Sequence, residues 1–157
     1  MNIFVLDYDL QKCAQYHCDR HVVKMILESA QMLSTALRVN GVDKGYKSTH
    51  ENHPCTIWVR TSLSNWKWLW DLANCLNSEY RYRFNKAANH ESWNLIRSLP
   101  HPPITDIGLT KFAQAMPDKY KCEDTVVAYR KFYIGEKMKL FSWSGRKIPY
   151  WIQRETN

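Results

Sequence analysis

The sequence lacks the features of a secreted, zinc-bound or membrane-spanning protein. Its five cysteines are odd in number and form no Cys-x-x-Cys pair, which argues against a disulfide framework and a four-cysteine zinc site. The longest stretch without a charged residue, residues 29–37, is far too short to cross a bilayer. Asp7 and Asp9 come too early for a signal peptide. We therefore expect a cytoplasmic protein that uses no metal, no cofactor and no membrane.

Aromatic and basic residues are abundant in this 157-residue chain. Apolar types make up 45% of it and aromatic types 13%, which excludes intrinsic disorder and allows a continuous core. The formal net charge of +7 favours a polyanionic partner, with DNA as the first expectation and a free nucleotide as the second. A merely soluble basic protein is the alternative. The oligomeric state does not follow from these numbers.

Hydrophobic spacing and capping residues predict an all-α fold, with one helical domain over residues 1–157 and a long, mostly buried first helix. Asp9 suits the N-cap of that helix, and Pro54 suits the first position of the next. The apolar segment 2–6 is either a strand-like lead-in or a buried arm. Helices are expected over residues 10–39, with a break near 17–19, over 54–84, with a bend at Ser62 or Ser64, and over 91–99, 109–115 and 123–137.

Six polar residues of the first expected helix follow one another at spacings of 4, 3, 4, 3 and 4, which places them on one narrow stripe. Because apolar residues cover the rest of that helix, such a stripe needs partners or a function, and we expect it to line a concave surface. A solvated helix face is the alternative. The six residues are His17, His21, Lys24, Glu28, Gln31 and Thr35.

The stripe supplies the groups for acid–base and nucleophilic chemistry. Glu28 suits a general acid or base, and Lys24 offers an amine that becomes nucleophilic when it is desolvated. His21 completes the catalytic candidates, as a proton shuttle or phosphate ligand. His17 and Gln31 are expected to bind substrate.

A second polar segment, residues 46–54, leads into a helix start, whose free N–H groups favour an anion. His50 and His53 would flank a phosphate there. The alternatives are that one of these histidines caps the helix, or that the two together bind a metal ion weakly. An aromatic next to a basic residue suits an unstacked base and its phosphate. Further substrate-binding candidates on later helices are Arg60, Asn65, Tyr129, Arg130 and Lys137.

Two resemblances cover different parts of the chain. One resemblance is to a family of small phage-encoded proteins, and it implies no activity. It rests on the segments MNIFVLDYD, HCDRHVVKMILESAQMLSTA, NHPCTIWVR and AYRKFYIGEK. Asp19-Arg20-His21, followed seven residues later by Glu28, resembles the first helix of the pyrimidine-dimer DNA glycosylases of the endonuclease V type. The segments from Gly45-Tyr46 to His53-Pro54 and from Glu79 to Arg83 are also similar to that family.

The second resemblance implies a small, basic, all-α enzyme in which an amine attacks C1′ of the damaged nucleotide and Glu28 assists at the sugar. In that family the amine belongs to a small second residue, exposed after removal of the initiator methionine. Asn2 is bulky here, so Met1 should remain attached. Either Met1 supplies the amine, or Lys24 replaces it, or the chemistry has changed or been lost.

Three functions remain open at this point. The first is a DNA N-glycosylase with an additional strand-cleaving lyase activity. The second is a hydrolase or transferase that acts on free nucleotides. The third is a non-catalytic binder of nucleic acid or of a nucleotide signal, as in phage counter-defence.

Overall fold

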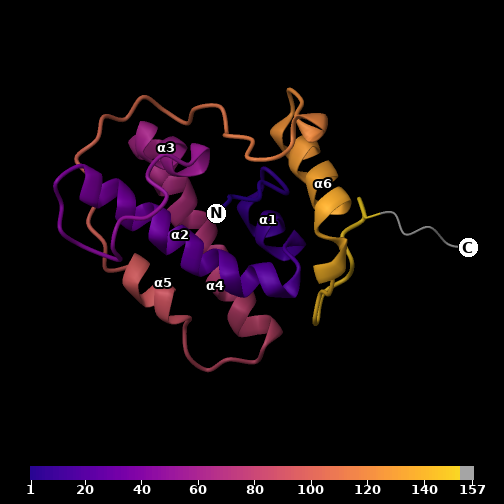
Figure 1. Ribbon diagram of the computed structural model, residues 1–157. Helices are drawn as coiled ribbons and strands as arrows, with labels where there is room; N and C mark the ends of the chain where they lie inside the picture. Colours follow the sequence, from indigo (N-terminus) through magenta and orange to yellow (C-terminus); the bar gives the residue numbers. More distant parts are fainter. Residues whose placement is uncertain (153–157) are drawn as a thin grey trace, which may run out of the picture.

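A computed structural model describes residues 1–152, and Figure 1 shows helices joined by loops. The predicted all-α fold is confirmed over this part of the chain. In chain order the helices are α1 (Leu10–Tyr16), α2 (Asp19–Val39), α3 (Pro54–Thr61), α4 (Leu63–Arg83), α5 (Glu91–Ile96) and α6 (Thr125–Glu136), with the short 3-10 turns η1 (Asp118–Tyr120) and η2 (Met138–Leu140) on either side of α6.

Each of the two long helices expected from the sequence is divided near the predicted position. His17 and Cys18 have extended backbone between α1 and α2, and Ser62 has extended backbone between α3 and α4. The Asp9 side chain accepts a hydrogen bond from the Lys12 amide and caps α1 as expected. The helix breaks thus follow from local backbone preferences that the sequence signals.

The helix predicted over residues 109–115 is wrong, because this segment forms an irregular loop. Side chains from other helices form hydrogen bonds with the backbone of this loop. Asn65 Oδ1 accepts from the Thr110 amide at 3.0 Å, and the Tyr129 hydroxyl accepts from the Ala115 amide at 3.2 Å. These tertiary hydrogen bonds replace those that a helix would have made.

Helix α2 lies at the centre of the fold and packs against α3, α4 and α5 (Figure 1). Its Val22, Ile26 and Leu33 side chains are fully buried, as the apolar spacing predicted. The N-terminal segment is a buried arm rather than a strand, and its Phe4 ring stacks on the His21 ring of α2 at 4.6 Å. This packing brings the first residues of the chain against α2.

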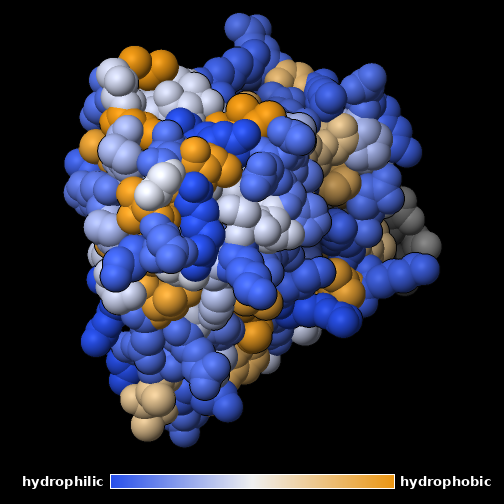
Figure 2. Space-filling model, turned by 60° about the vertical axis from the view of Figure 1, so that its left-hand side comes forward, coloured by the Kyte–Doolittle hydropathy of each residue, from blue (hydrophilic) through white to orange (hydrophobic). Residues whose placement is uncertain are grey.

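The molecular surface is largely hydrophilic where Figure 2 shows it, and apolar residues there form small patches among polar ones. Within residues 1–152, no helix has both the length and the apolar character needed to cross a membrane. The apolar residues of the described chain therefore serve mainly the core between the helices.

Asn65 is the polar residue on which the packing of the 105–116 loop depends. It is fully buried, and its amide group donates to the Trp58 carbonyl at 2.8 Å and to Thr110 Oγ1 at 2.7 Å. We expect Asn65→Ala to lower the free energy of unfolding by about 3 kcal/mol, because it leaves buried partners unpaired. Urea denaturation measures this change. Asn74→Ala, at an exposed position of the same helix, should change stability by less than about 0.5 kcal/mol.

Candidate active site

The first residue of the chain lies against Glu28, in the middle of α2. The Met1 nitrogen is 3.4 Å from Glu28 Oε1, and the Asn2 amide donates to the same oxygen at 3.1 Å. The Met1 side chain is 3% exposed and that of Glu28 is 11% exposed. The amine and the carboxylate therefore lie within ion-pair distance of each other, beside two largely buried side chains.

Asn2 fixes the position of this amine. Its Nδ2 donates to the Ala115 carbonyl at 2.9 Å, while its Oδ1 accepts from the Tyr129 hydroxyl at 2.9 Å. Burial raises the pKa of Tyr129 well above its ordinary value and that of the neighbouring Cys55 to about 11. The wall behind the amine is therefore uncharged at neutral pH.

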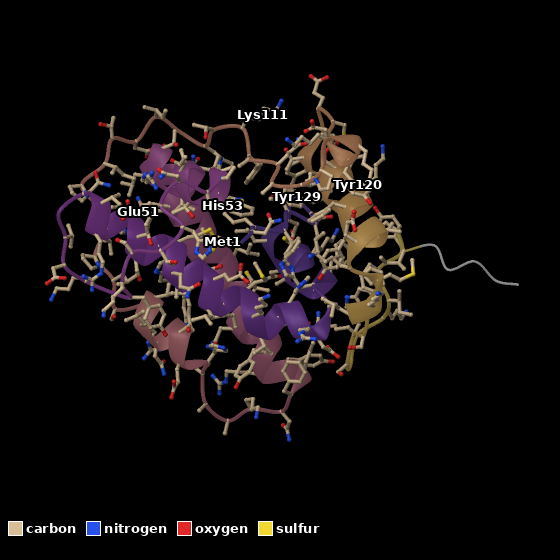
Figure 3. All side chains as sticks on the ribbon, in the orientation of Figure 1. Met1, Glu51, His53, Lys111, Tyr120 and Tyr129 are labelled. Atoms are coloured by element: carbon tan, nitrogen blue, oxygen red, sulfur yellow. The ribbon has the colours of Figure 1, made fainter. Side chains whose placement is uncertain are left out.

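His53 lies near the amine, whose positive charge acts on it, and in Figure 3 the Met1 label stands directly below that of His53. Its Nδ1 accepts from the Cys55 amide at 3.1 Å and so caps α3. Burial, followed by the positive charge of the N-terminal amine, lowers the pKa of His53. The ring is neutral at pH 7, and because Nδ1 is an acceptor its proton resides on Nε2. His53 thus offers a hydrogen-bond donor beside the amine.

Lys24 completes the group of charges around Glu28. Its Nζ is 3.8 Å from Glu28 Oε2, and its side chain is 61% exposed. Gln31 follows one turn later on α2 and is half-buried. Lys24 and Glu28 are therefore the residues of the predicted polar stripe with recorded contacts at this site, and Gln31 lies one turn beyond Glu28.

The two histidines of the stripe lie elsewhere, in the core. His17 is fully buried and its Nδ1 is 2.7 Å from the Cys13 carbonyl, while His21 Nδ1 is 2.7 Å from the Tyr133 hydroxyl. Burial is the largest cause that lowers the pKa of His17 to about 4 and that of His21 to about 3. Both rings are neutral at pH 7 and pack among aromatic side chains. Their predicted roles in binding and catalysis stay predictions.

These two histidines make stability depend on pH. Below their ordinary pKa of 6.5 both histidines take up a proton in the unfolded chain but stay neutral in the folded one. Their contribution to the free energy of unfolding is therefore fully present above pH 6.5 and falls as the pH drops toward 4. We expect each to cost about 2 kcal/mol at pH 5. Urea denaturation at pH 7.5 and pH 5 measures the loss. His21→Gln should reduce the difference between the two pH values, whereas a substitution at the exposed His101 should leave it unchanged.

The remaining candidate residues on the loop and on α3 and α4 have contacts within the fold, and their predicted contacts with substrate stay predictions. His50 is exposed and has a φ of +50°, unusual for a residue other than glycine. Arg60 Nη1 donates to the Glu51 carbonyl at 2.6 Å and so fixes the loop before α3. Asn65 is enclosed in the core, as described above. The structure does not bring Arg60 or Asn65 to the amine.

Of the three candidates on α6 and at its end, one lies at the site and two have contacts elsewhere in the fold. Tyr129 contacts Asn2 and belongs to the site. Arg130 donates to the Leu6 carbonyl at 2.8 Å and to Asp7 Oδ2 at 2.9 Å, and Lys137 lies over the Phe132 ring at 5.4 Å. Their predicted contacts with substrate are not tested by these positions. Within the described residues, no group of three or more His, Cys, Asp or Glu side chains is placed to hold a metal ion.

Three site residues were not among the predicted ones. Asn2, Cys55 and Ala115 come together around the amine from separate parts of the chain. Cys55 follows His53 closely enough that the helix start could have suggested it. Nothing in the sequence signals Ala115, because its contribution is a backbone carbonyl in an irregular loop.

The segments that resemble the glycosylases meet in space. Asp19 Oδ1 is 3.2 Å from Arg83 Nη1, and Arg83 Nε donates to Glu79 Oε1 at 2.9 Å. Arg83 also donates to the His17 carbonyl at 2.7 Å. These buried charges join α2 to α4 and hold Glu28 at a fixed place in the fold, so they support the site without touching the amine.

A small, basic, all-helical fold with an amine beside a largely buried carboxylate is compatible with the class of DNA N-glycosylases that act through an amine. The family model of the pyrimidine dimer DNA glycosylases matches residues 1–92, more than half of the chain, and the chain belongs to this family. Its function is accordingly that of a DNA glycosylase of this kind, as the resemblance implied. The matched range includes Met1, Glu28 and His53. No curated protein and no solved structure matches the chain.

Proposed function

We propose that the chain breaks the glycosidic bond of one pyrimidine in a dimer lesion through the α-amine at Met1, with Glu28 as its catalytic partner, and then cleaves the strand as a lyase. The observation that carries this proposal is the 3.4 Å approach of the Met1 nitrogen to Glu28 Oε1, a carboxylate whose side chain is largely buried. A nearby carboxylate accepts a proton from the amine and stabilises positive charge that develops as the amine reacts.

The reaction proceeds in three balanced steps. The Glu28 carboxylate takes a proton from the ammonium group, and the nitrogen lone pair forms a bond to C1′ while the glycosidic bond breaks. The pyrimidine takes the bonding electrons and a further proton from the nitrogen, and it stays joined to its partner base through the cyclobutane ring. Opening of the sugar ring leaves a protonated imine between the nitrogen and C1′, and O4′ takes the proton that Glu28 had accepted. Loss of a C2′ proton then expels the 3′ phosphate and breaks the strand. Glu28 faces the nitrogen throughout and is the group placed to move these protons.

The same geometry favours Met1 over Lys24 as the amine. The Lys24 side chain is 61% exposed and hydrated, and its nitrogen lies 3.8 Å from Glu28, farther than that of Met1. The Met1 amine is also held in place by the hydrogen bonds of Asn2, whereas the Lys24 amine ends a long exposed side chain. If Met1 were removed, the Asn2 nitrogen would become the amine at 3.1 Å from the same carboxylate oxygen. Lys24 then serves to hold a DNA phosphate.

The test uses an end-labelled duplex that contains one cyclobutane pyrimidine dimer. We expect a strand break at the lesion and, when borohydride is present, a permanent protein–DNA cross-link, because borohydride reduces the imine. An undamaged duplex of the same sequence is the control and should give neither. Glycosidic cleavage without strand break or cross-link, seen as a base-free sugar at which alkali breaks the strand, would contradict the lyase step, and a duplex left intact even by alkali would contradict the whole proposal.

A further inference from the structure

An exposed stripe of α2 carries two aliphatic side chains beside two basic ones. Arg20, Val23, Lys24 and Leu27 are exposed and lie on one face of the helix, since they are spaced by three or four residues. Val23 is 37% exposed and Leu27 is 40% exposed, while their neighbours Val22 and Ile26 are fully buried. We call these four residues the α2 stripe.

The α2 stripe borders the candidate active site. Leu27 directly precedes Glu28, and Lys24, between the two aliphatic residues, has its Nζ 3.8 Å from Glu28 Oε2. Val23 and Leu27 are one helical turn apart, so their side chains adjoin. The α2 stripe therefore adjoins the carboxylate that faces the amine.

The charge of the α2 stripe fits DNA. Arg20 and Lys24 are exposed, whereas the two acidic residues next to the stripe on this helix are engaged elsewhere: Glu28 is only 8% exposed, and Asp19 contacts Arg83 and Ser144. Basic groups on either side of an apolar pair match a polyanionic backbone that surrounds an apolar base stack. The net charge of +7 adds to the attraction between the chain and a polyanion.

We propose that Leu27 and Val23 enter the base stack at the lesion, with Arg20 and Lys24 on the flanking phosphates. The inference rests on the proposed function in that an amine reaches C1′ only after the nucleotide has left the stack. An apolar side chain that fills the resulting gap offsets part of the cost of unstacking, as apolar wedges do in other DNA-binding proteins. Leu27 and Val23 are positioning residues and not catalytic ones.

The test compares Val23→Ala/Leu27→Ala with the native chain on the same dimer lesion in duplex and in single-stranded DNA. We expect cleavage of the duplex to fall about tenfold or more, since unstacking then lacks its wedge, while cleavage of the single strand stays within about twofold. A 2-aminopurine next to the lesion reports unstacking, and its fluorescence rise on binding should fall in the variant.

Val39→Ala is the matched control, because Val39 is 40% exposed on the same helix and lies about 16 Å from Glu28 along its axis. It should behave like the native chain. The proposal would be overturned if cleavage of the duplex and cleavage of the single strand fell equally in the double variant, or if its fluorescence rise were unchanged. Loss of a dimer of this chain in the double variant, measured by light scattering, would assign the stripe to a second copy instead. The fluorescence assay needs no turnover, so it separates failure of this inference from failure of the proposed function.

Discussion

Glu28→Gln should abolish most turnover on a pyrimidine-dimer duplex while the protein stays folded and bound to DNA. The amide oxygen of glutamine can still accept from the Met1 and Asn2 nitrogens, which now contact Glu28 Oε1 at 3.4 and 3.1 Å. What is lost is the charge and the ability to exchange a proton. We expect the single-turnover rate to fall about a hundredfold or more, with the dissociation constant within about twofold of the native value.

Glu51→Gln provides the matched control, because it removes the same charge from an exposed position on the loop that precedes α3. In Figure 3 Glu51 lies away from Met1. Its side chain contributes no hydrogen bond among the described residues, and Arg60 contacts only its carbonyl. This variant should retain native turnover. Undiminished activity of Glu28→Gln would rule out the role assigned to this carboxylate.

Blocking the N-terminal amine should have the largest effect of all. Acetylation turns the nitrogen into an amide, whose lone pair is delocalised, and leaves the Glu28 carboxylate in place. We expect borohydride cross-linking and strand cleavage to fall to background, a loss of about a thousandfold or more, because no other amine is held in the same position. Cross-linking to an end-labelled lesion duplex measures the loss, and gel-shift binding to the same DNA should persist.

Lys24→Arg separates the two amines. Arginine keeps the positive charge and the phosphate contact proposed for Lys24 but has no primary amine. This variant should cross-link as well as the native chain. A protein whose cross-linking survives acetylation of Met1 and disappears in Lys24→Arg would transfer the nucleophilic role to Lys24.

Local sequence signals predicted the helical architecture well. Asp9 and His53 cap the helices that follow them, and the breaks near His17 and at Ser62 lie where extended backbone was expected. The loop over residues 109–115 was missed because its hydrogen bonds go to Asn65 and Tyr129, which are distant in the sequence. Helical spacing within one segment contains no information about such partners.

The candidate site was only partly predictable for the same reason. The spacing on α2 identified Glu28 and Lys24 but also placed His17 and His21 on the same stripe, although the structure buries both histidines. The arm that carries Met1 covers one part of the stripe and its Phe4 covers His21. Which polar residues of a helix line a site therefore depends on how the arm packs, and this packing follows from tertiary contacts rather than from helical periodicity.

The most direct test of the central claim is to locate the borohydride-trapped adduct by mass spectrometry. The cross-linked protein is digested with nuclease and protease, and the peptide that carries the reduced sugar is fragmented. The geometry predicts that the sugar is attached to the α-nitrogen of Met1, or of Asn2 if Met1 has been removed. Attachment to Lys24 Nζ, or the absence of any adduct on an active protein, would contradict it.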